Sequence, residues 1–61
     1  MNPSTMDDEE LVETHEDMLR AQRAEFEAGH GTAARDVAGL RQDVWEEARE
    51  RGIEGRLGGG R

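Results

Sequence analysis

The sequence predicts an all-α protein: a two-helix antiparallel hairpin that dimerises into a four-helix bundle. Two long stretches with helical hydrophobic periodicity stand on either side of Gly29 and Gly31, and these glycines permit a turn between helices. The chain has 61 residues, enough for one domain, and no cysteine for disulfides or thiolate metal sites. A second chain is therefore the expected way to complete the core.

Residues 1–5 are expected to form a short flexible lead-in before a helix over about 6–28. Ser4 or Thr5 is the expected N-cap, and the acidic residues that follow suit the positive end of the helix dipole. At about 100° per residue, five apolar side chains of this helix fall on one stripe. These are Leu11, Val12, Met18, Leu19 and Phe26.

Two polar residues, His15 and Gln22, lie inside this apolar stripe, one heptad apart. We expect them to form hydrogen bonds across a helix pair and to fix its alignment. Carboxylate-bridged metal sites in bundles use Glu-x-x-His on facing helices, whereas Val12 stands three residues before His15. Glu27 and His30 have the right spacing, but they lie where the helix should end. The sequence therefore predicts no metal site and no cofactor.

The turn is placed at 29–31, and Thr32 is expected to cap a second helix over about 33–51. Apolar residues recur in this helix at spacings of three and four, which predicts one buried stripe. The stripe comprises Ala33, Val37, Leu40, Val44 and Ala48, with Ala34 and Trp45 beside it.

Gly52 followed by Ile53 is typical of a Schellman stop, in which the residue after the glycine folds back on the helix. The hairpin therefore covers 6–53, and the glycine-rich tail 54–61 is expected to be flexible. Combining the two stripes gives the predicted core and dimer interface. Its members are Leu11, Val12, His15, Met18, Leu19, Gln22, Phe26, Val37, Leu40, Val44, Trp45 and Ala48.

The formal net charge is −7, and residues 1–18 contain seven acidic residues and no Lys or Arg. Binding to duplex DNA requires a basic face, so we expect no direct nucleic-acid binding. No apolar run approaches the roughly 20 residues that span a bilayer, and residues 1–6 lack the pattern of a signal peptide. These features predict a cytoplasmic protein without membrane contact.

Two helices offer no deep cleft with converging catalytic groups, so we expect no enzymatic activity. The favoured function is that of a small acidic regulatory or adaptor protein, which pairs with itself and binds an unidentified protein. The alternative is a phage- or defence-type inhibitor that imitates nucleic acid and blocks a basic groove. It would use an acidic face formed by Glu9, Glu13, Glu16 and Asp17. A third possibility is a small helical subunit of a larger complex.

Overall fold

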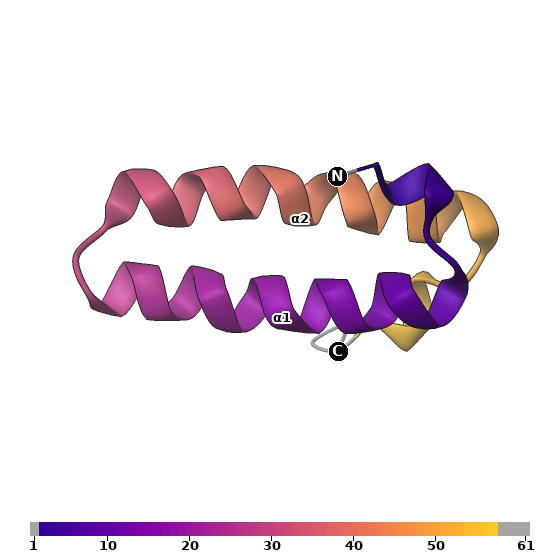
Figure 1. Ribbon diagram of the computed structural model, residues 1–61, viewed down its shortest axis with the longest axis horizontal. Coiled ribbons are helices and arrows are strands. Elements are labelled where there is room, and N and C mark those ends of the chain that lie inside the picture. Colours follow the sequence, from indigo (N-terminus) through magenta and orange to yellow (C-terminus); the bar gives the residue numbers. More distant parts are fainter. Residues whose placement is uncertain (1, 58–61) are drawn as a thin grey trace.

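The computed structural model describes residues 2–57. Two antiparallel helices, α1 (Asp8–Glu27) and α2 (Gly31–Arg51), form the hairpin. One short 3₁₀ helix precedes them, η1 (Pro3–Thr5), and another follows, η2 (Glu54–Arg56). Figure 1 shows α1 and α2 side by side along their length, with η1 and η2 both at the end opposite the turn. The predicted all-α helical hairpin is confirmed, and residues 2–57 contain no strand.

The first long helix begins later than the sequence analysis expected because Asp7 is its N-cap. The Asp7 carboxylate accepts a hydrogen bond of 2.8 Å from the backbone N–H of Glu10. Ser4 and Thr5, the expected caps, belong to η1, where the Asn2 side chain accepts from the Ser4 N–H. Asn2 therefore caps a separate short turn, and Asp7 caps α1.

The turn between the helices is tighter than predicted. Gly29 adopts a left-handed conformation with φ of 83°, and the N–H of His30 returns to the carbonyl of Glu25 at 2.8 Å. This Schellman geometry leads directly into α2, whose first residue is Gly31 and whose N-cap position is His30. The prediction that Thr32 caps α2 was therefore wrong, because Thr32 already lies inside the helix.

The predicted Schellman stop at the end of α2 is confirmed. Gly52 has a left-handed backbone with φ of 75°, and the N–H of Ile53 donates to the carbonyl of Ala48 at 2.9 Å. This bond folds the chain back toward α2, which carries η2 across the end of the hairpin (Figure 1).

The segment after α2 packs against the hairpin as far as the structure describes it. Leu57, directly after η2, is only 3% exposed, and Arg56 forms an ion pair with Glu9 of α1 at 2.6 Å. The flexibility expected of 54–61 stays a prediction, and residues 58–61 lie outside the described part of the chain.

The core lies between the helices and is small. Its apolar members are Leu11, Ala34, Val44, Ala48 and Leu57, and the polar His15 is buried among them. The face of α1 toward α2 is therefore centred on Leu11 and His15, whereas Phe26 is 74% exposed. The single wide stripe predicted for this helix is thus divided between the core and an outer face.

The inward face of α2 is rotated relative to the prediction. Ala34 is buried whereas Ala33 is half-buried, and Leu40 is 47% exposed. Arg41 lies seven residues after Ala34 and seven before Ala48, so it is on the same side of α2, facing α1. An arginine can occupy this position because its aliphatic stem packs while its guanidinium reaches a polar partner.

Candidate functional site

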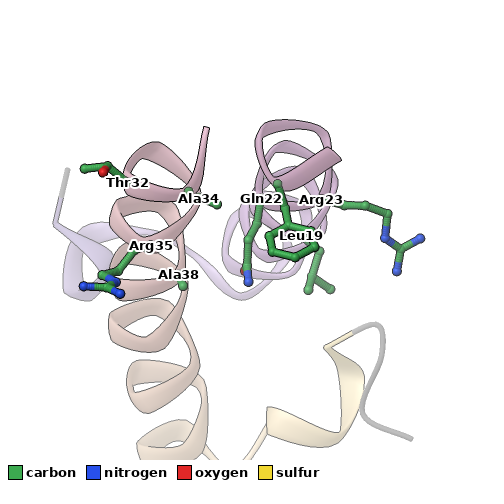
Figure 2. Close-up of a pocket in the computed structure, with 9 residues that line it drawn as sticks. Leu19, Gln22, Arg23, Thr32, Ala34, Arg35 and Ala38 are labelled. Carbon is green, nitrogen blue, oxygen red and sulfur yellow. The ribbon is translucent and has the colours of Figure 1, made fainter. Parts of the chain in front are cut away.

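An open groove of about 710 Å³ lies between α1 and α2 beside the turn, and we call it the turn-end groove. Figure 2 shows Gln22 extending from α1 into the space beside α2, where Ala34 and Ala38 present only short side chains. The groove is lined by Leu19, Gln22, Arg23, Phe26, Gly31, Thr32, Ala34, Arg35 and Ala38.

The groove exists because large side chains of α1 lie opposite small side chains of α2 near the turn. Leu19 and Phe26 come from α1, whereas α2 contributes two alanines, Ala34 and Ala38. Alanine leaves the space beside these long side chains unfilled, so Phe26 remains 74% exposed. Phe26 and half-buried Leu19 therefore place apolar surface along the groove.

Two arginines lie at the outer edges of the groove. Arg23 extends outward from α1 and Arg35 from α2 (Figure 2). Within residues 2–57 neither arginine forms an ion pair, although the chain carries far more acids than bases. The groove therefore combines apolar surface from Leu19 and Phe26 with polar side chains and two available cations, and it suits an amphipathic segment that carries carboxylates.

The interior next to the groove contains a polar pair that joins the two helices. Nε of Arg41 donates a hydrogen bond of 3.0 Å to Oε1 of Gln22. The expectation that Gln22 bonds across a helix pair is therefore met within one hairpin. The sequence analysis did not identify Arg41 as its partner. The heptad spacing of Arg41 from Ala34 and Ala48 was the signal that could have shown it.

The expectation that His15 forms a hydrogen bond across the helices was wrong. His15 is 3% exposed, and both ring nitrogens, Nδ1 and Nε2, are buried without a hydrogen-bond partner. Burial disfavours the charged imidazolium and lowers the pKa of His15. The nearby Arg41 cation lowers this pKa further, and the Glu16 carboxylate opposes the shift. His15 is therefore a neutral, desolvated side chain in the hairpin core.

The end of the hairpin opposite the groove is held by arginine contacts. Arg51 donates to Glu47 at 2.9 Å and to Asp8 at 3.0 Å, and these two hydrogen bonds raise the pKa of its guanidinium. The same guanidinium donates to the carbonyl oxygens of Pro3 at 3.3 Å and Ser4 at 3.4 Å. One side chain thus joins η1, α1 and α2, so this end is covered while the turn end remains open.

The predicted acidic face lies on the exposed side of α1, and two of its four carboxylates are paired within the chain. Glu9 pairs with Arg56, and Asp17 pairs with Arg20. Glu13 and Glu16 are exposed and form no ion pair with any residue from 2 to 57. The charge that this face offers to a partner is therefore concentrated in two of its four residues.

The structure separates the residues of the predicted core and interface into three groups. Leu11, His15, Val44 and Ala48 are buried. Val12, Met18, Leu19, Gln22, Val37 and Trp45 are half-buried, and Arg49 lies over the Trp45 ring at 5.7 Å. Phe26 and Leu40 are exposed. Their place between two copies stays a prediction.

The described residues contain no group of three or more His, Cys, Asp or Glu side chains placed to hold a metal ion. None of the helices in this part of the chain is long and apolar enough to cross a membrane. The turn-end groove is lined by no carboxylate or imidazole that could transfer a proton.

No protein-family model matches this chain, and no curated protein or solved structure matches it significantly.

Proposed function

We propose that this chain is a small, non-enzymatic regulatory or adaptor protein of the cytoplasm, which acts by binding other protein chains. The observation that supports this proposal most directly is the turn-end groove. It places exposed Phe26 and half-buried Leu19 between Arg23 and Arg35, and neither arginine has an ion-pair partner within residues 2–57. Pairing of two hairpins into a four-helix bundle is part of this proposal, since the single hairpin buries few apolar residues.

The test is site-specific cross-linking in the source cells. A photoreactive amino acid at position 26 would lie at the groove, and the same group at position 40 is the control. Leu40 is also exposed, but it lies about 200° around α2 from the groove residue Ala38. Apart from adducts between two copies of the chain, the proposal expects one defined adduct with another protein from position 26, identified by mass spectrometry, and no adduct with another protein from position 40.

A binding measurement completes the test. The identified protein, once purified, should bind the parent chain and lose at least about tenfold in affinity for Phe26→Asp, because a carboxylate replaces a buried aromatic contact. Equal cross-linking from both positions, or unchanged binding by Phe26→Asp, would contradict a docking role for the groove.

The alternative is nucleic-acid mimicry by the acidic face. Binding of that kind should weaken steeply between low and moderate salt, whereas binding centred on Leu19 and Phe26 of the groove should weaken less. Substituting Glu9, Glu13, Glu16 and Asp17 by their amides tests the same point. Retained binding by this variant eliminates mimicry, and lost binding eliminates the groove as the main contact. A subunit of a larger complex would instead yield adducts with several components of one assembly.

A further inference from the structure

A second stripe runs along α1 beside the one that faces α2. Its residues are spaced by 4, 3, 4 and 3 positions, which keeps them on one face of the helix. Each residue of the stripe lies one position after a residue on the side of α1 that faces α2. The stripe is therefore turned by about 100° around the helix axis from the core. The stripe consists of Val12, Glu16, Leu19, Arg23 and Phe26.

The turn-end half of this stripe is uncovered. Glu16, Arg23 and Phe26 are exposed, and Leu19 between them is half-buried. Neither Glu16 nor Arg23 forms an ion pair with any other residue in the described range. The stripe therefore combines an apolar row with one available anion and one available cation.

The order of these residues along α1 is symmetric about Leu19. Val12 stands seven positions before it and Phe26 seven positions after it. Glu16 stands three positions before Leu19 and Arg23 four positions after it. At about 1.5 Å per residue, the distances along the helix axis match to within about 1.5 Å for each pair. A stripe with this arrangement is complementary to its own reverse.

We propose that the stripe is the contact surface for a second copy of this chain, with the two α1 helices antiparallel about a two-fold axis near Leu19. In this register Leu19 packs against the partner's Leu19, and Phe26 packs against the partner's Val12. Glu16 meets the partner's Arg23 on each side of the axis, which forms two equivalent ion pairs. The contact closes on itself and yields a discrete dimer.

The signs of the charges on Glu16 and Arg23 favour a second copy of this chain as the partner, and they favour an antiparallel arrangement of the two α1 helices. A parallel pair in register would place Glu16 against the partner's Glu16, and Arg23 against the partner's Arg23. An unrelated acidic helix would satisfy Arg23 and repel Glu16. Because each copy has a net charge of −7, association also requires local opposite charges at the contact. The antiparallel second copy provides them at both ends.

This inference rests on the proposed function, since it names a second copy as one chain that docks beside the turn-end groove. Leu19 and Phe26 belong to both the stripe and the groove lining. The partner's α1 would therefore cover the α1 side of the groove.

Cysteine cross-linking tests the position of the axis, because the chain contains no cysteine of its own. Leu19→Cys places two thiols across the two-fold axis, so mild oxidation of the full chain should form a disulfide-linked dimer. Leu40→Cys is the matched control, an exposed leucine of α2 on the far side from the groove. The expected rate is about tenfold or more higher at position 19, because the thiols are held close together. Equal rates, or faster linkage at position 40, would overturn the inference.

A charge exchange tests the register by sedimentation equilibrium. Glu16→Arg alone or Arg23→Glu alone should weaken dimerisation about five- to thirtyfold, because each removes two attractive pairs and creates two repulsive ones. The combined exchange should restore the parent affinity. Glu16→Arg also lowers the net negative charge, so an unspecific charge effect would strengthen its association. That result, or a double variant that fails to recover, would refute the register.

Glu16, Arg23 and Leu40 are exposed and Leu19 is half-buried, and circular dichroism at a fixed concentration checks that each variant remains helical. A chain that stays monomeric in sedimentation overturns this inference. The proposed function would then be tested separately, by the cross-linking of position 26 to another protein. A dimer in the stated register without any such adduct would support the inference and contradict the adaptor role.

Discussion

Replacing His15 by leucine should stabilise the protein, although histidine lies at the centre of its core. His15 is 3% exposed, and both of its ring nitrogens are buried without a hydrogen-bond partner. Leaving a buried polar group unsatisfied costs about 1–3 kcal/mol. Leucine removes both nitrogens, and the imperfect fit of its branched side chain offsets about 1 kcal/mol of that gain. We expect a net stabilisation of about 1 kcal/mol at pH 7.

The pH dependence provides a second and independent readout. The pKa of His15 is lowered in the folded state by desolvation and by Arg41 of α2, with Glu16 of α1 acting in the opposite direction. Below the unfolded value of about 6.5 the unfolded chain binds a proton that the folded chain does not bind. Stability is therefore fully present above pH 6.5 and falls as the pH decreases from there toward the folded pKa. The slope cannot exceed about 1.4 kcal/mol per pH unit for one histidine.

The assay is urea unfolding followed by circular dichroism at one protein concentration, between pH 8 and pH 5. His15→Leu should have a higher midpoint and a stability nearly independent of pH between 7 and 5. His30→Gln is the matched control, because His30 is the other histidine and its side chain is exposed. This control should retain the parent slope. A destabilised His15→Leu, or one that keeps the parent slope, would refute the account of His15 as a desolvated group without partners.

Other predictions concern a glycine inside α2, the helix ends and the terminal contacts. Gly39→Ala should stabilise by about 0.5–1 kcal/mol, because Gly39 lies within α2 and an added Cβ meets no atom within 4 Å. Gly52→Ala should destabilise by about 1 kcal/mol, since φ of 75° strains any residue with a Cβ, and thermal unfolding of this pair compares the two effects. Asp7→Ala should cost about 1 kcal/mol in the same assay by removing the cap of Glu10. Arg51→Met should accelerate amide exchange and proteolysis around η1, and unchanged protection there would contradict its role in holding that segment.

The sequence was sufficient to predict the hairpin because its signals are local. The glycines at 29 and 52 adopt the left-handed conformations that end the two helices, and helical periodicity defines the elements between them. The N-caps were less predictable, since Ser4, Thr5 and Asp7 are all good caps at neighbouring positions. Tertiary context, which periodicity does not contain, decided among them.

The candidate site was only partly predictable, for a different reason. Hydrophobic periodicity locates an apolar face to within about one position, or about 100° on a helix. An error of one position is enough to replace Ala34 and Arg41, which face α1 in the structure, by the predicted Ala33 and Leu40. A polar residue such as Arg41 breaks the pattern and was therefore not assigned to the interior. The groove could not be anticipated at all, because it results from the side-chain sizes of two helices packed in one specific register.

The character of the core leads to a last prediction. Two of its five buried apolar residues are alanines, and His15 together with half-buried Arg41 interrupts it with polar groups. A core of this size stabilises a chain of 61 residues only marginally, so much of the stability should come from pairing. The melting temperature should then rise with protein concentration, by about 5–10 °C for a hundredfold increase. Arg23→Glu should lower the melting temperature at high concentration and leave it unchanged at low concentration, where both chains are monomeric. A melting temperature independent of concentration would mean that the hairpin is stable alone, and the exposed Phe26 would then have to be explained by a different partner.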